Sequence, residues 1–128
     1  MSVKFKVIAK KNPLDAEADP KFYASAVSSG DINLRALVKE IAARSTVSAA
    51  DTMAVIESLL EVIPQNLADG KIVRLGELGN FYLRIKSTGA ETEAKCGKSN
   101  IEAVKLHFRA GKEFNTVLKL IDFEKVSS

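Results

Sequence analysis

Gly70–Ile85 reads GKIVRLGELGNFYLRI and predicts a β-hairpin. Hydrophobic and polar residues alternate on both sides of a turn marked by Gly76 and Gly79, and successive side chains of a strand point to opposite faces. A third stretch, Ile101–Arg109, alternates in the same way. We therefore expect a three-stranded sheet with an apolar face and a basic face. The basic face would carry Arg74, Tyr82, Arg84, Lys86, Lys105, His107 and Arg109.

Two helices are predicted before this hairpin. Asn33 is a suitable N-cap for the first, and Ser48 with Asp51 forms a near capping box for the second, which runs to about Ala68. The second helix carries two apolar stripes, Met53, Ile56, Leu60, Ile63 and Leu67 on one and Val55, Leu59 and Val62 on the other. A helix that is apolar over so much of its surface is buried on several sides. The simplest explanation is a two-fold homodimer, and the alternative is that an N-terminal hairpin covers the second stripe within one chain.

The flanking segments predict three regions. Residues 1–30 contain two alternating stretches and form an N-terminal β-hairpin extension, residues 31–121 form the main domain, and residues 122–128 form a C-terminal tail that offers one more strand. A short helix is expected after Gly111. The polar segment of about residues 86–100, between two strands of the sheet, is either a long loop or an extended β-arm.

Composition excludes several classes of protein. The chain has 128 residues, is 46% hydrophobic and 27% charged, and has a formal net charge of +3, which is typical of one globular domain. A single cysteine, Cys96, cannot form a disulfide within the chain, and with one histidine it supplies too few ligands for a zinc site. No signal peptide, membrane span, cofactor motif or catalytic constellation is recognisable. We expect a non-enzymatic cytoplasmic protein without a metal or cofactor.

Two motifs carry a family resemblance. Gly79-x-Phe81 follows the predicted turn, and Phe108-Arg109-Ala110-Gly111-Lys112 opens the last helix. Together with the order of the predicted helices and strands, these motifs make the segment from about Asp31 to Leu120 resemble the HU/IHF family of bacterial histone-like DNA-binding proteins. The added hairpin is similar to the divergent HU-related subgroup of Bacteroides-type bacteria. The resemblance implies an α+β fold with a helical-hairpin base, a three-stranded antiparallel sheet, a β-arm and a short C-terminal helix, in an intertwined dimer.

The resemblance also implies DNA-binding residues. Carried over by position, the main phosphate contacts are Arg84, Lys86, Arg109 and Lys112. A second rank consists of Arg74, Lys95, Lys98 and Lys105. Strand alternation by itself already places Arg84, Lys86 and Arg109 on the polar face.

The arm departs from the family pattern. No proline follows Pro64, so the arm cannot wedge a proline between base pairs. Glu91 and Glu93 also offset Lys95 and Lys98. The predicted function is largely sequence-independent binding of double-stranded DNA by a nucleoid-associated homodimer. The DNA would preferably be bent or distorted, and no proline would intercalate. RNA is a further possible partner. The alternative is an HU-fold dimer that has lost tight DNA binding and binds another protein through its N-terminal extension.

The N-terminal extension has a role of its own to explain. Lys4, Lys6 and Lys10 lie on one face of its first predicted strand, opposite Val3 and Phe5. The extension either has a mainly structural role, in which it extends the sheet or covers the dimer, or it adds phosphate contacts through these lysines and Lys11. We favour the structural role.

Overall fold

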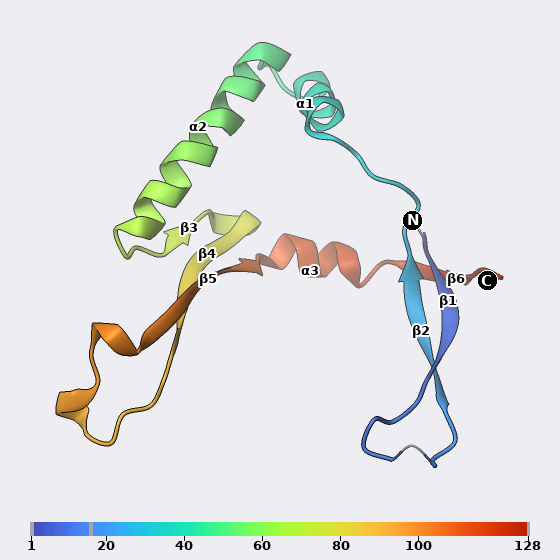
Figure 1. Cartoon of the computed structure of the whole chain (residues 1–128). Helices are drawn as coiled ribbons and strands as arrows, with labels where there is room; N and C mark the ends of the chain where they lie inside the picture. Colours follow the sequence, from blue (N-terminus) through green and yellow to red (C-terminus); the bar gives the residue numbers. More distant parts are fainter. Residues whose placement is uncertain (1, 16, 128) are drawn as a thin grey trace. The chain divides into compact units, whose positions relative to one another are not determined.

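A computed structural model describes residues 2–15 and 17–127 of the chain (Figure 1). The chain forms two compact units. One contains the chain up to Leu37 together with the segment from Val117 onward, and the other contains Val38–Thr116.

The first unit is built on a three-stranded sheet with the order β2-β1-β6. β1 (Ser2–Lys10) and β2 (Lys21–Val27) pair antiparallel as neighbours in sequence (Figure 1). β6 (Asp122–Lys125) pairs parallel to β1, and the pairing continues where the Val126 amide donates to the Phe5 carbonyl at 2.9 Å. The two ends of the chain, which the sequence pattern treats as separate regions, therefore share one sheet.

Two helices precede the second sheet, and their predicted caps are confirmed. α1 (Leu34–Ala43) begins where Asn33 Oδ1 accepts a hydrogen bond from the Ala36 amide at 2.9 Å. α2 (Ala49–Ala68) begins where Ser48 Oγ accepts from the Asp51 amide at 3.1 Å. Each cap satisfies an amide that has no partner inside the helix.

No helix of the described residues is long and apolar enough to cross a membrane.

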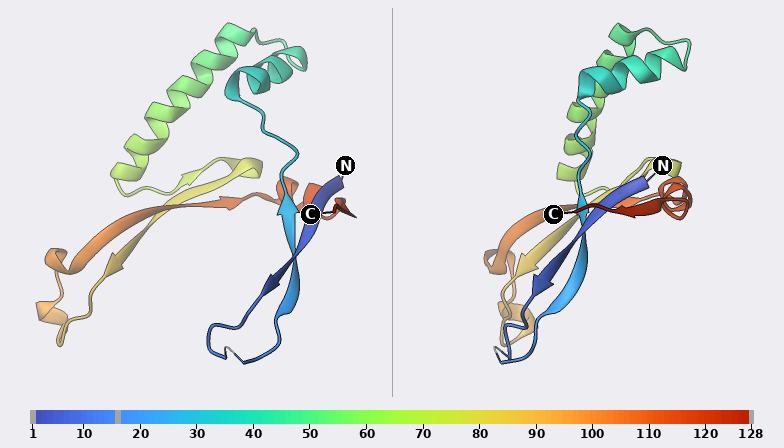
Figure 2. Two further views of the ribbon diagram at one scale, coloured as in Figure 1. Left: turned by 45° about the vertical axis from the view of Figure 1, so that its right-hand side comes forward. Right: turned by 90° about the vertical axis from the view of Figure 1, so that its right-hand side faces the viewer.

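The second sheet has the order β3-β4-β5 and is antiparallel throughout. β4 (Gly79–Ser87) and β5 (Ile101–Ala110) are long, and they extend beyond β3 as a two-stranded ribbon that ends in a loop (Figure 2). β3 (Val73–Arg74) has only two residues, because the chain then enters a 3₁₀ turn, η1 (Gly76–Leu78). The predicted hairpin is present, with a first strand shorter than the alternation suggested. α3 (Lys112–Leu118) follows β5.

Gly111 explains why the motif that opens α3 contains a glycine. Its amide donates to the Leu78 carbonyl at 3.2 Å, so η1 lies directly against it. A β-carbon added at Gly111 would overlap the carbonyl oxygen of Glu77 and lie 2.6 Å from that residue's carbonyl carbon. Because these are backbone atoms, they cannot rotate away, and only glycine fits.

Replacing Gly111 with alanine should therefore destabilise the protein by about 1–3 kcal/mol, as overpacking generally does. Urea denaturation at fixed protein concentration measures this loss. Gly97→Ala is the matched control, because an added β-carbon there meets no atom within 4 Å. Equal denaturation midpoints for the two variants would contradict the steric argument.

The apolar side chains of the second unit form an open groove. α2 contributes one wall and the apolar face of the sheet another, and the groove has a volume of about 600 Å³. Across the described residues, the hydrophobic side chains that are buried are Val38 and Leu67. The groove is lined by Ile56, Leu59, Leu60, Ile63, Pro64, Leu67, Ala68, Leu75, Leu78, Phe81, Leu83 and Leu106. One chain therefore leaves most of its core-like residues in contact with solvent.

Candidate nucleic-acid interface

The strand register brings the predicted basic residues to one face of the second sheet. Directly paired residues of an antiparallel sheet lie on the same face. Arg84 pairs with Lys105, Asn80 pairs with both Arg74 and Arg109, and Lys86 pairs with Ala103. We call this surface the basic face; its cations are Arg74, Arg84, Lys86, Lys105 and Arg109. All five are exposed.

An aromatic pair lies between these cations. Tyr82 and His107 are directly opposite each other, with ring centroids 5.6 Å apart and an interplanar angle of 16°. The Arg84 guanidinium carbon lies 5.5 Å from the centroid of the Tyr82 ring, within the range of a cation–π interaction. The Tyr82 ring therefore offers the Arg84 guanidinium a flat aromatic surface. Sequence alternation placed both aromatic residues on the polar face but did not pair them, because their contact depends on the register.

The opposite face of the same strands is apolar. Phe81 is paired with Phe108, and their ring centroids are 4.8 Å apart. Leu83 is paired with Leu106, and three of these four residues, Phe81, Leu83 and Leu106, line the groove beside α2. Because this face is turned toward the groove, the basic face is the one left for a polar partner.

The arm is a ribbon with a folded loop at its end. The β4–β5 ladder ends with a register shift at Ser87, which pairs with Ile101. Between them the chain makes two short 3₁₀ turns, η2 (Glu93–Lys95) and η3 (Lys98–Asn100), and Cys96 is an exposed free thiol. The tip is therefore a structured loop rather than an extension of the two strands.

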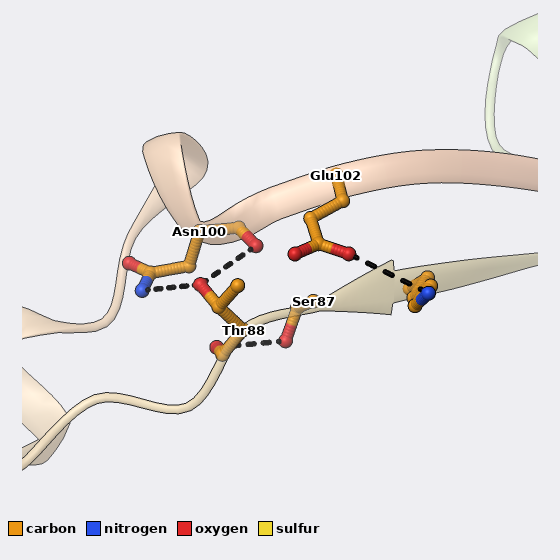
Figure 3. Close-up of polar contacts among 5 residues, drawn as sticks. Ser87, Thr88, Asn100 and Glu102 are labelled. Atoms are coloured by element: carbon orange, nitrogen blue, oxygen red, sulfur yellow. Dashed lines mark hydrogen bonds and ion pairs between the residues drawn. The ribbon is translucent and has the colours of Figure 1, made fainter.

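Asn100 closes the base of this loop (Figure 3). The Thr88 amide donates to the Asn100 carbonyl at 2.8 Å. The Asn100 side chain donates from Nδ2 to Thr88 Oγ1 at 3.1 Å and accepts from the Gly97 amide at 2.9 Å. One side chain thus ties the start of the loop to its end.

Asn100→Ala should loosen the arm loop with little effect on global stability. Two side-chain hydrogen bonds are removed, but the site is exposed, so the free energy of unfolding should change by less than about 0.5 kcal/mol. The Thr88 amide should exchange its hydrogen faster, which hydrogen–deuterium exchange measures. Ser99→Ala, in the same turn, is the control. Unchanged exchange at Thr88 would show that the backbone alone closes the loop.

Carboxylates offset part of the arm's positive charge. Lys86 Nζ lies 3.7 Å from Glu102 Oε2 (Glu102 is labelled in Figure 3), and Lys95 Nζ lies 3.6 Å from Glu91 Oε2. Both pairs are solvent-exposed, so each contributes little to stability. They nevertheless offset the charges of Lys86 and Lys95, whereas Arg84, Lys105 and Arg109 form no ion pair among the described residues.

The remaining predicted cations are outside the paired strands β3, β4 and β5. Lys95 is in η2 and Lys98 is in η3, both in the arm loop, whereas Lys112 is the first residue of α3. The structure thus gathers five of the eight predicted DNA-binding residues on one surface, with two more in the arm and one next to Gly111. Their contacts with DNA remain predictions.

A family model for the HU domain fused to a wHTH, Ig or glycine-rich motif (HU-HIG) matches residues 1–125. The chain belongs to the HU-HIG family. The match includes the N-terminal strands, so the extension is part of the HU-HIG pattern. This membership confirms the predicted relationship to HU proteins.

Two further proteins are similar to this HU-HIG chain. DNA-binding protein HU-1 of Halalkalibacterium halodurans is 30% identical over 90 residues, which cover 69% of this chain and all of HU-1. A crystal structure from Bacteroides vulgatus, provisionally described as a bacterial DNA-binding protein, matches with a TM-score of 0.65 and 14% identity. That match covers 96% of this chain and 48% of the other, so the HU-HIG chain spans about half the length of that structure. At this identity the likeness concerns the fold.

Proposed function

We propose that this chain binds double-stranded DNA as a homodimer, with little sequence preference, as an architectural protein of the bacterial nucleoid. The observation that carries the proposal is the basic face, with five exposed cations on one side of a sheet whose other side is apolar. Lysine and arginine that neutralise phosphates release condensed counterions, which drives binding without reading bases. The similarity to DNA-binding protein HU-1 supports the same partner.

Two features support the proposed dimer. The groove beside α2 is apolar and open, and Leu60 and Leu106 in it are 67% and 58% exposed. The second apolar stripe of α2 is also uncovered, since Val55 is 58% and Val62 51% exposed. Monomeric soluble proteins rarely expose contiguous apolar surface on this scale. A second copy of the chain would supply the missing half of the core, as expected for an intertwined HU-type dimer.

The arm and the basic face together favour DNA that is already bent or easily bent. Proline intercalation is not available, because no proline follows Pro64. Without a wedge, the protein has less means to kink a straight duplex, and it gains more from nicks, junctions and flexible steps that cost less to deform.

A second candidate function is a protein-interaction dimer. The observation that favours it is the pairing of Lys86 and Lys95 with carboxylates, which weakens the arm as a phosphate clamp. On this view the N-terminal extension binds another protein, and the basic face is an ordinary solvated surface.

Fluorescence anisotropy with labelled linear, nicked and four-way-junction DNA, titrated over salt, tests the proposal. We expect the logarithm of the affinity to fall linearly with the logarithm of the salt concentration, and the nicked and junction DNAs to bind more tightly. Duplex RNA of the same length tests the discrimination between nucleic acids. Weak, salt-insensitive binding of every DNA would overturn the proposal in favour of a protein partner.

A further inference from the structure

The N-terminal unit has a cationic face of its own. Lys4, Lys6 and Lys10 of β1 lie on one side of the sheet, and Lys21 of β2 is directly opposite Lys10. We call these four residues the lysine face; all four are exposed. The sequence pattern identified the row on β1, but the register adds Lys21 and places it next to Lys10.

Few acidic groups face this row. Glu124 pairs with Lys4, and Asp122 pairs with Ser2, both at the β6 edge of the sheet. Within residues 2–15 and 17–127, the ion pairs are Lys86–Glu102 and Lys95–Glu91. None of the four lysines is therefore neutralised by a direct ion pair in the described chain. This contrasts with Lys86 of the basic face and Lys95 of the arm loop, which are each paired with a glutamate.

The shape of the lysine face indicates the kind of anion that fits it. A strand rises about 3.4 Å per residue, so the Cα atoms of Lys4 and Lys6 are about 7 Å apart, and those of Lys4 and Lys10 are about 20 Å apart. At its far end, Lys10 Nζ lies 5.9 Å from the Tyr23 ring centroid, and Lys10, Lys11, Lys21 and Tyr23 line an open hollow beside Asp19. Ammonium groups spaced along a line can each meet a different phosphate of a nucleic-acid backbone. A single small anion would instead need several donors that point to one place.

We infer that the lysine face is a second phosphate-binding surface for double-stranded DNA, separate from the basic face. It rests on the proposed function, that this chain binds DNA. Each ammonium group that meets a phosphate adds to counterion release, so the surface raises affinity without adding sequence preference. The apolar reverse side of the sheet, with Val3, Phe5 and Phe123, remains the structural side.

The test compares two variants of the full chain that lose the same charge. The test variant K4Q/K6Q/K10Q removes the charges of three lysines of the lysine face. The control variant K39Q/K71Q/K119Q removes the charges of three exposed lysines that belong to neither the lysine face nor the basic face. We expect the first variant to bind duplex DNA on the order of tenfold more weakly, with a salt slope smaller by roughly 2 to 3, and the second to stay near wild type. Equal affinities and slopes for the two variants would overturn the inference.

Failure of the inference is distinguishable from failure of the proposed function. If the wild-type chain binds DNA and K4Q/K6Q/K10Q matches its control, only the lysine face is excluded. If the wild-type chain shows no salt-dependent binding, both are excluded. Melting temperatures check that the sheet is intact, and K4R/K6R/K10R, which keeps the charge, should retain wild-type affinity. Loss of binding in this arginine variant at an unchanged melting temperature would overturn the electrostatic mechanism.

Discussion

Leu60→Asp should prevent this chain from forming a stable folded dimer. Leu60 lies on α2, lines the apolar groove and is 67% exposed in a single chain. If a second copy covers the groove, the aspartate is buried without a partner, which costs several kcal/mol in each subunit. Domains are stable by only roughly 5–15 kcal/mol, so this substitution removes much of the total. Sedimentation equilibrium and circular dichroism over a range of protein concentrations measure mass and folding together.

Leu14→Asp is the matched control for this experiment. Leu14 is 95% exposed in the loop between β1 and β2, so the same substitution there should change stability by no more than about 0.5 kcal/mol. If the single chain were the complete folding unit, Leu60→Asp would be as harmless as Leu14→Asp. A folded monomer or dimer of wild-type stability carrying Leu60→Asp would exclude this groove from the dimer interface.

Reversing the charge of Arg84 and Arg109 together should weaken DNA binding by at least about 100-fold at low salt. The two arginines lie on the basic face, Arg84 within cation–π distance of the Tyr82 ring and Arg109 opposite Asn80. Each reversal removes a cation that would neutralise a phosphate and places a carboxylate where the phosphate would lie. The salt slope should fall by about 0.9 for each phosphate that is no longer neutralised, and binding should weaken similarly for all DNA sequences.

R35E/R44E controls for net charge. Both arginines are exposed, and the double reversal changes the charge of the chain by the same amount as R84E/R109E. Long-range attraction to DNA weakens equally in the two variants, so a difference between them reports binding at the basic face. Anisotropy titrations with several duplex sequences provide the measurement. Equal weakening in both variants would assign binding to overall charge, and weakening confined to one sequence would indicate base readout.

The strand and helix patterns were informative because their signals are local. Alternation identified the long strands β4 and β5 and assigned their side chains to faces, and the residues at Asn33 and Ser48 identified where the helices begin. Alternation overestimated the length of β3. The hydrogen bond from the Leu75 amide to the Gly79 carbonyl closes a tight turn, and the hydropathy of the side chains does not show where such a turn begins.

Other features depend on contacts between distant parts of the chain. The parallel pairing of β6 with β1 joins segments more than a hundred residues apart, and nothing in the local sequence of either strand predicts which strand it pairs with. The stack of Tyr82 on His107 and the Lys86–Glu102 pair also follow from the register of β4 against β5. These contacts decide which cations of the predicted site are free and which are paired with carboxylates.

Local sequence signals were enough to predict the helices and strands, the helix starts, the apolar and polar faces of the sheet, and the location of its main cations on one face. These properties follow from periodicity and capping, which act over a few residues. Three features come from the three-dimensional structure: β1 and β6 share a sheet, the Glu77 backbone leaves room only for glycine at position 111, and Lys21 belongs to the lysine face. Those features arise from strand pairing and close packing, whose physical basis lies in atoms brought together from distant positions of the chain.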